Sequence, residues 1–308
     1  MSANVTPTVS VTPPAAGAMT PKLAKGGSRQ NPWLRGLFYF LLVVIAFYML
    51  FPFYWAIRSA LTPEVDAGNT PVQYFPSDAT LSNFGDALTG GVLKQPLINS
   101  FIVAGLVTLL SLIVGASAAY ALGRIRFRGR TIMMYAILSM TIFPQIAILG
   151  ALYTQFSNWG LINTRWSLVI SYLIFTLPFT IWVLQSFFAS LPRELEESAY
   201  VDGASPFRTF WAVMLPLAAP GLVTTGLLAF INAWNEYLYA VSFLQTADNY
   251  TVPVAIANWP PATSGSAFAQ PWDHIMAGTV VVTLPLIVLV LIFQRRLVAG
   301  LTSGAVKG

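Results

Sequence analysis

The polar and aromatic side chains with the clearest spacing lie in the segment 194–214, ELEESAYVDGASPFRTFWAVM. Three carboxylates stand together at its start: Glu194, Glu196 and Glu197. Ser190, followed by Pro192, predicts that a helix begins just before them, because serine caps helices and proline is tolerated in their first turn. Gly203 can adopt the positive φ that a sharp exit from this helix needs. The chemistry that this pattern favours is recognition of another surface.

A second helix is predicted to follow, with Ser205 as its cap and Pro206 as its first residue. Four large apolar side chains recur on one face of it: Phe207, Phe210, Trp211 and Met214. Pro216 and Pro220 are expected to end it. Such a stripe can lie in a membrane interface, but interfacial helices favour Lys and Arg, and this segment opens with acids. The composition therefore favours docking into a protein groove over the interfacial alternative.

The remaining residues offer little for catalysis. The chain has no cysteine and one histidine, His274, which excludes thiol chemistry and a His-rich metal site. No set of nucleophile, base and orienting group is visible, and no G-x-x-x-x-G-K-[ST] stretch for nucleotide phosphates occurs. We expect no catalytic residue, no metal site and no cofactor bound by this chain, and His274 is expected to be an interfacial loop residue.

The composition indicates a membrane protein. Only 9% of the 308 residues are charged and 56% are hydrophobic, whereas soluble domains carry about 25% charged residues. Six apolar runs each exceed the roughly 20 residues that cross a bilayer: about 34–58, 98–122, 132–155, 167–190, 219–243 and 276–298. Thr141, Pro144 and Gln145 interrupt the third run. The sequence thus predicts an all-α integral membrane protein with six transmembrane helices.

The termini and the basic residues set the organisation around these spans. Residues 1–33 are rich in Pro, Ser, Thr, Gly and Ala and predict a disordered tail, followed by a six-helix domain over 34–298 and a tail over 299–308. Of the 16 Lys and Arg residues, all but Arg58, Lys94 and Arg165 fall in the N-terminal tail and the start of span one, at the C-terminal end of span six and beyond, or in alternate loops. This positive-inside pattern predicts that both termini are cytoplasmic. It explains the net charge of +5 without nucleic acid.

The same orientation places residues 191–218 in the cytoplasm and two long segments, 59–97 and 244–274, outside. Long ordered loops are often functional, and a plain exposed connector is the alternative. Inside the fifth span, Glu236 is the only carboxylate that we place within a span. Ionisable residues in a bilayer usually face a bundle interior or an aqueous cavity. Glu236 is therefore a translocation-path or gate residue, or else an interhelical hydrogen-bond partner near the outer interface.

The cytoplasmic segment resembles a known signature. ESA at 197–199, then Gly203, then VMLP at 213–216 after a nine-residue gap are similar to the EAA loop of membrane subunits of binding-protein-dependent ABC importers. The family pattern is Glu-Ala-Ala, three residues, Gly, nine residues, Ile, any residue, Leu-Pro. Ser198 replaces the first Ala and Val213 replaces Ile, and both changes are mild.

The resemblance covers residues 34–308. INSFIVA, LPFTIWVLQSFF and AWNEYLYA are similar to the carbohydrate-uptake branch, and FQRRLVAGLTSGAVKG at the end resembles the second, shorter permease subunit of maltose and trehalose importers. It implies a non-catalytic permease subunit that forms half of a translocation path for a maltose-, maltodextrin- or trehalose-type oligosaccharide. The implied partners are a second permease subunit, two cytoplasmic subunits that bind ATP and Mg²⁺, an extracytoplasmic sugar-binding protein, and lipid of a bacterial or archaeal plasma membrane.

The resemblance also implies which residues act. A short helix around Gly203 would insert into a cleft of the ATPase subunit, with Glu197 as polar anchor and the C-terminal tail reaching toward the ATPase dimer interface. The implied coupling residues are Glu197, Ser198, Ala199, Asp202, Gly203, Ala204, Phe207, Leu215 and Pro216. Trp234 and Asn235, beside Glu236, could touch the passing sugar, since aromatic faces and amides commonly hold sugars.

The external segment 244–274 is expected to contact the binding protein. By resemblance to the maltose system, the part around Asn258, Trp259, Pro260 and Pro261 would probe the open cleft of that protein and help to release the sugar. A single-chain secondary transporter is the alternative function. It would need coupling-ion ligands at midplane and usually internal repeats, and one carboxylate within the spans and no visible repeat argue against it.

Overall fold

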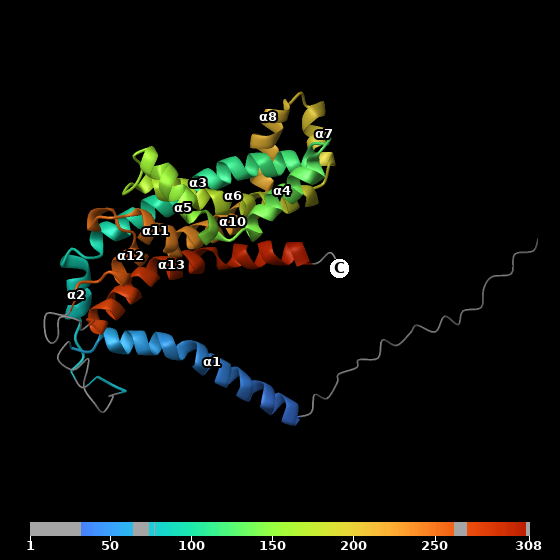
Figure 1. Ribbon diagram of the computed structural model, residues 1–308. Helices are drawn as coiled ribbons and strands as arrows, with labels where there is room; N and C mark the ends of the chain where they lie inside the picture. Colours follow the sequence, from blue (N-terminus) through green and yellow to red (C-terminus); the bar gives the residue numbers. More distant parts are fainter. Residues whose placement is uncertain (1–31, 64–73, 77, 262–269, 306–308) are drawn as a thin grey trace, which may run out of the picture. The chain divides into compact units, whose positions relative to one another are not determined.

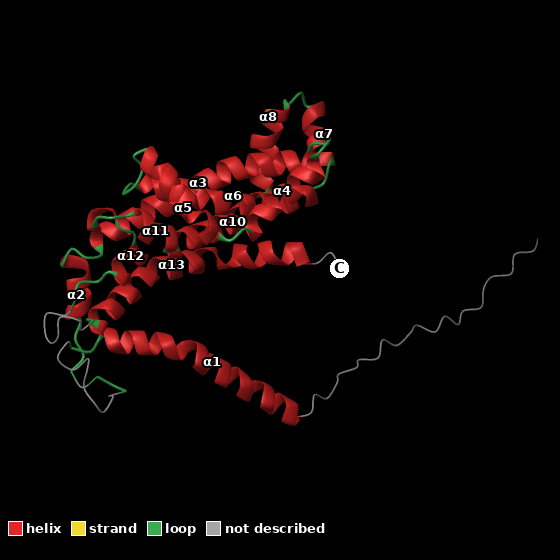
Figure 2. Cartoon of the chain, viewed as in Figure 1, coloured by secondary structure: helices red, strands yellow, loops and turns green. Residues whose placement is uncertain are grey.

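A computed structural model describes residues 32–63, 74–76, 78–261 and 270–305 of the chain. The described residues form helices joined by turns and loops, with no strand among them (Figure 2). The predicted tail falls outside the described part as far as residue 31. The chain divides into two units, Met1–Leu50 and Phe51–Gly308. All packing described below lies within the second unit.

The described helices include candidates for membrane spans. Four are long and apolar enough: α1 (Pro32–Ala60), α3 (Lys94–Arg124), α6 (Arg165–Ser190) and the part of α13 (Trp272–Ala305) that ends at Arg295. Two bent pairs also pass together: α4 (Arg130–Ile142) with α5 (Gln145–Asn158) at 92°, and Pro206–Leu217 with α10 (Ala219–Asn235) at 76°. Length and composition thus give four to six spans among the described residues.

Two of the predicted spans are broken. In the third, Phe143 and Pro144 adopt extended backbone between α4 and α5, at the interruption that the sequence showed. In the fifth, α10 ends at Asn235, Glu236 is extended, and the chain resumes as α11 (Leu238–Phe243). At the other end of the chain, α13 continues as helix to Ala305, so helical structure extends into the predicted tail over 299–308.

Short helices occupy the segments between spans. The predicted external segments contain α2 (Ser82–Thr89), η3 (Ala247–Asn249) and α12 (Val252–Ala257). The predicted cytoplasmic segment contains α7 (Glu194–Val201), α8 (Pro206–Thr209), the π-helical turn η2 (Phe210–Met214) and α9 (Leu215–Leu217). Figure 1 shows α7 and α8 at one end of α3 and α6, with α2 and α12 toward the other end.

Helices α3 and α6 make the most extensive helix pair. Gly115 of α3 allows their close approach, because a Cβ there would lie 2.5 Å from Cγ2 of Thr180 in α6. Small residues at such points let helix backbones pack tightly in membranes. Buried apolar side chains gather into two clusters: one around Tyr239 and Phe156, and one around Phe188 and Phe210. The second cluster packs Phe210 and Met214 of η2 against α3 and α6.

Candidate functional site

The turn between α7 and α8 forms as the sequence predicts. Gly203 has φ 80°, and its N–H donates to the Tyr200 carbonyl at 3.0 Å while the N–H of Ala204 donates to the Ala199 carbonyl at 2.9 Å. These two hydrogen bonds end α7 with Gly203 in the left-handed backbone conformation, which glycine favours at the end of a helix. Ser205 Oγ then accepts the N–H of Arg208 at 3.3 Å and caps α8. The predicted cap at Ser205 and the turn at Gly203 are confirmed.

The predicted cap at Ser190 is wrong. Ser190 is the last residue of α6, and its hydroxyl donates to the Phe187 carbonyl in the preceding turn at 2.8 Å. Leu191 is extended, with φ −69° and ψ 144°, as expected for a residue before proline. The break at Leu191 therefore ends one helix, and α7 begins at Glu194.

The predicted apolar stripe divides into two faces. Phe210 and Met214 are buried in the cluster beside α3 and α6, with the ring of Phe210 centred 4.9 Å from that of Tyr120. Phe207 remains 73% exposed, and Trp211 is also exposed. The residues Phe210–Met214 form a π-helical turn, and the four side chains do not share one face. Phe210 and Met214 therefore anchor the segment to the rest of the chain, whereas Phe207 and Trp211 remain exposed.

The implied coupling residues lie mainly on the surface of this helix-turn-helix. Six are exposed: Glu197, Ser198, Asp202, Gly203, Phe207 and Pro216. Ala204 and Leu215 are half-buried, and Ala199 is buried against the chain. Val201, which sequence reasoning did not single out, is 88% exposed. Its position at i+4 from Glu197 could have indicated it, because residues four apart share a helix face. We call Glu197, Val201 and Phe207 the coupling surface.

The neighbouring acid points the other way. Glu196 accepts a hydrogen bond from Nε of Arg124, at the end of α3, at 3.0 Å, and Nη2 of Arg124 forms an ion pair with the same oxygen at 2.9 Å. The two side chains are 14% and 5% exposed, respectively. Adjacent glutamates thus differ in role: Glu196 holds the segment to α3, and Glu197 faces outward. The sequence alone could not pair Glu196 with a residue 72 positions away.

A second candidate site is a pocket of about 570 Å³ where the two broken spans meet α6. Its lining combines hydroxyls, amides, one carboxylate and aromatic rings: Thr141, Phe143, Gln145, Tyr172, Phe175, Thr176, Phe179, Asn232, Ala233, Asn235, Glu236, Tyr237, Leu238 and Tyr239. The polar residues come from the α4–α5 break, from α6 and from the α10–α11 break. Such a mixture, held between apolar helices, suits a neutral polyhydroxylated ligand.

Glu236 shapes this pocket through the backbone. Its carboxylate accepts the N–H groups of Tyr239 at 2.8 Å and Ala240 at 3.2 Å, so it caps the start of α11. The Tyr239 hydroxyl in turn donates to the Gln145 carbonyl at 2.9 Å, which lies at the start of α5. The two helix breaks are therefore joined by hydrogen bonds. The side-chain amide of Asn235 donates a hydrogen bond to the Ile231 carbonyl of its own helix.

The three path residues inferred from sequence do not lie together. Asn235 and Glu236 line the pocket. Trp234 does not; it is 2% exposed and packs against Phe101 and Phe230, with ring centroids 4.7 Å and 5.7 Å away. Successive helical residues point in directions about 100° apart, which explains why Trp234 turns to the core while its neighbours face the pocket.

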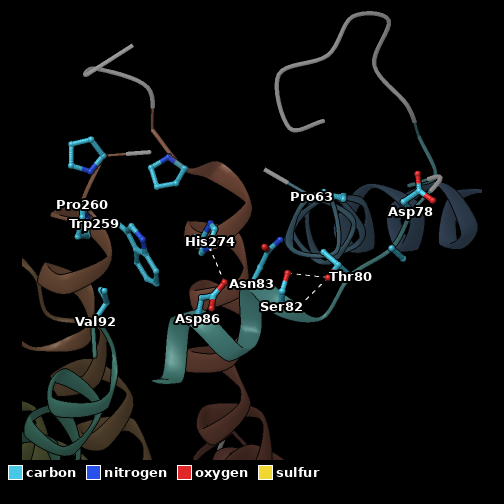
Figure 3. A pocket seen from close by; sticks show the side chains of 13 residues that line it. Pro63, Asp78, Thr80, Ser82, Asn83, Asp86, Val92, Trp259, Pro260 and His274 are labelled. Atoms are coloured by element: carbon cyan, nitrogen blue, oxygen red, sulfur yellow. Dashed lines mark hydrogen bonds and ion pairs between the residues drawn. The ribbon is translucent and has the colours of Figure 1, made fainter. Parts of the chain in front are cut away.

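A third candidate site is a pocket of about 810 Å³ at the other end of α3 (Figure 3). Trp259, Pro260 and Pro261 line it together with residues of α2 and the first turn of α13, whereas the exposed Asn258 does not. His274 Nε2 lies 3.5 Å from an oxygen of Asp86 across this pocket. In the described part of the chain, no three His, Asp or Glu side chains gather into a metal site.

Apolar helices with broken spans, a polar pocket at the breaks and an exposed helix-turn-helix at one end define a membrane transport protein. Residues 111–303 match the family described as binding-protein-dependent transport system inner membrane component. This match covers more than half of the chain. The chain therefore belongs to that family and is the transmembrane subunit of an ABC importer.

Similar proteins support the same family. The chain is 42% identical over 261 residues to the trehalose transport system permease protein SugB of Mycobacterium tuberculosis, covering 85% of this chain and 93% of the relative. It is 39% identical over 268 residues to the trehalose/maltose transport system permease protein MalG of Thermococcus litoralis, covering 86% and 94%. The fold is similar to a bacterial ABC transporter involved in alginate import, with TM-score 0.75 and 23% identity over 87% of this chain and 98% of that one.

Proposed function

We propose that this chain is one of two permease subunits of a sugar importer and forms half of the path for a trehalose- or maltose-type oligosaccharide. The names of the relatives support the substrate class. The observation that carries the proposal is the pocket at Glu236, where amides, hydroxyls and aromatic rings converge between apolar helices. The hydroxyl groups of a sugar can form hydrogen bonds with the amides, and its apolar ring faces can stack on the aromatic rings. Trehalose- and maltose-type sugars are uncharged, so their passage places no charge within the bilayer.

The proposed arrangement has six spans, with both termini in the cytoplasm of a bacterial or archaeal inner membrane. α4 with α5 forms the third span, and α10 with α11 forms the fifth. This chain has no catalytic role and binds no cofactor; ATP and Mg²⁺ belong to two cytoplasmic ATPase subunits. An external sugar-binding protein delivers the sugar, and Trp259, Pro260 and Pro261 at the external pocket are its proposed contact, with the exposed Asn258 beside them.

The coupling surface is the proposed contact with the ATPase subunit. Glu197 supplies an exposed carboxylate, and Val201 and Phe207 supply exposed apolar area on the adjoining helices. Helix-in-groove contacts use such apolar anchors, and a carboxylate adds a charge-assisted bond to a basic partner residue. Because Phe210 and Met214 are buried beneath them, movement of the docked helices is passed to the chain.

Glu197→Ala is expected to lower association with the ATPase subunits by about tenfold or more, because truncating one partner of a buried charge pair costs about 2–5 kcal/mol and each 1.4 kcal/mol is tenfold. The measurement is co-purification through a tagged permease, followed by ATP hydrolysis stimulated by binding protein and trehalose or maltose. Asp248→Ala is the control, since Asp248 is an exposed carboxylate in the predicted external segment, away from α7.

Equal association of Glu197→Ala and the unsubstituted chain would remove Glu197 from the docking contact. Sugar uptake that persists in cells lacking the ATPase subunits would favour the single-chain secondary transporter instead. The two results address different parts of the proposal, since the first concerns one residue and the second the energy source.

The absence of cysteine from the chain makes the proposed orientation directly testable. In right-side-out vesicles, an impermeant maleimide is expected to label Ala247→Cys, in the exposed external segment, without permeabilisation. Arg128→Cys, in the exposed loop between α3 and α4, is expected to react only after permeabilisation. The opposite pattern would invert the orientation, and labelling of both positions from one side would contradict the proposed number of spans between them.

A further inference from the structure

We call the stretch from α7 to η2, Glu194–Met214, the coupling segment. One buried side chain, Arg124, ties the C-terminal end of α3 to the start of this segment. Arg124 donates one hydrogen bond to Glu196 of α7 and forms an ion pair with the same carboxylate, as described above. Its Nη1 also donates to the Leu191 carbonyl at 2.8 Å, and its Nη2 to the Pro192 carbonyl at 3.1 Å. Both carbonyls lie just after the last residue of α6, in the region where a helix end leaves backbone carbonyls without partners in the helix. Arg124 therefore joins α3 to the end of α6 and to α7 at once.

A second contact from α3 reaches the other half of the coupling segment. One turn before Arg124, the ring of Tyr120 packs against Phe210 of η2 at 4.9 Å and against Phe188 of α6 at 5.6 Å. The end of α3 thus contacts α7 through charge and η2 through aromatic packing. A displacement of the coupling segment would act on α3 at both points.

The opposite end of α3 holds the external segment. The buried Asn99 donates from Nδ2 to the carbonyls of Asp248 and Tyr250, each at 2.8 Å. Next to it, Ser100 Oγ accepts the N–H of Val252 at 2.9 Å. Residues 248–252 lead directly into α12 and then into Trp259 at the external pocket. α3 is therefore attached by side-chain hydrogen bonds to both functional ends.

The helix between these ends is continuous. α3 runs over 31 residues from Lys94 to Arg124, whereas the third and fifth spans are each broken at a non-helical residue pair. From Asn99 to Arg124 the rise is roughly 37 Å at 1.5 Å per residue. Its close packing on α6 at Gly115 resists bending. α3 thus has the length and stiffness to connect the two ends mechanically.

We propose that Arg124 and Asn99 are positioning residues that fix the coupling segment and the external segment to one rigid helix. Movement imposed by the ATPase subunits at α7 and α8 is then transmitted through α3 to residues 248–252, which lead through α12 to the proposed binding-protein contact at Trp259. The inference rests on the proposed function, because the ATPase contact and the binding-protein contact that α3 connects are both part of that proposal. It adds the connection between them, which is made by hydrogen bonds that a substitution can remove.

The test compares complexes reconstituted in membranes. Arg124→Gln and Asn99→Leu are each expected to keep ATPase association and basal hydrolysis, but to lower binding-protein-stimulated hydrolysis and sugar transported per ATP by about tenfold. Arg124→Lys, which keeps the charge but lacks the fork that bonds several acceptors, is expected to show the same loss, which would assign the loss to the hydrogen bonds rather than to the charge. Retained ATPase association shows that each variant is folded. Ser117→Ala is the control, since this exposed α3 hydroxyl bonds only to the Ile113 carbonyl of its own helix.

A double-substitution cycle supplies the second readout. If Arg124 acts through Glu196, the double variant Arg124→Gln/Glu196→Gln is expected to be no worse than Arg124→Gln alone. Full stimulation in both Arg124→Gln and Asn99→Leu would overturn the proposal. So would loss of ATPase association in the Arg124 variants, because Arg124 would then only fold the docking surface. Failure of the docking proposal itself is seen separately, as unchanged association in Glu197→Ala.

Discussion

Gly203→Val is expected to remove most of the ATP hydrolysis that the binding protein stimulates. Gly203 has φ 80°, a conformation in which a β-branched residue is an outlier. A Cβ there would meet no atom within 4 Å, so the cost arises in the backbone rather than from a clash. The strain, about 1–2 kcal/mol or more, is relieved only if the turn opens, which moves α8, with Phe207, relative to α7, with Glu197. Hydrolysis and association in the purified complex measure the loss, which we expect to be tenfold or larger.

Gly129 provides a matched control for this experiment. It has φ 87° and also has open space around its Cβ position, but it precedes α4 and lies outside the coupling surface. Gly129→Val therefore carries the same backbone strain without disturbing the docking turn, and we expect ATPase association to be retained. Gly203→Asn is expected to be milder than Gly203→Val, since asparagine is enriched in the left-handed region. Equal losses at positions 203 and 129 would show a general effect of strain and contradict the docking role.

The parts of the structure that local sequence dictates could be predicted. The apolar runs predicted the long helices, and Pro144 marked the break between α4 and α5 because proline lacks the N–H that continues a helix. Ser205 and Gly203 predicted the α8 cap and the turn before it, since each acts on backbone within three residues of itself. The resemblance implied nine residues of this part of the chain; six of them are exposed, Ala199 is buried, and the exposed Val201 was not among them.

The features that depend on distant residues could not be predicted. The pairing of Glu196 with Arg124 joins positions 72 apart, and periodicity carries no information about such a contact. The spacing of the apolar stripe predicts one face, but packing against α3 and α6 buries Phe210 and Met214 and leaves Phe207 and Trp211 exposed. Likewise, Trp234 shares a short polar motif with Glu236 in sequence, yet tertiary packing turns it toward Phe101. In each case the outcome is set by what packs alongside the residue.

Glu236→Ala is expected to lower sugar uptake by about tenfold or more while leaving ATPase association unchanged. The carboxylate accepts the N–H groups of Tyr239 and Ala240, and in a proposed span few alternative acceptors exist for them; a lost helix cap costs about 0.5–2 kcal/mol even in water. α11 would shift with Tyr239, and the bond from its hydroxyl to Gln145 would be lost. Both breaks that line the pocket would then move. Uptake of labelled trehalose or maltose measures the effect, normalised to assembled complex.

Glu236→Gln separates the capping role from the charge. The glutamine side chain keeps one oxygen that can accept the N–H of Tyr239, but it carries no charge. If Glu236 acts chiefly by holding the start of α11, Glu236→Gln retains uptake within about threefold of the original, because one of the two backbone bonds survives, as a cap does with a neutral acceptor. Asn235→Ala is the control for the pocket surface, since Asn235 lines the same pocket without bonding α11. Equal loss of uptake in Glu236→Gln and Glu236→Ala would contradict the capping role and assign the effect to the charge, whereas full uptake in Glu236→Ala would remove Glu236 from the translocation path.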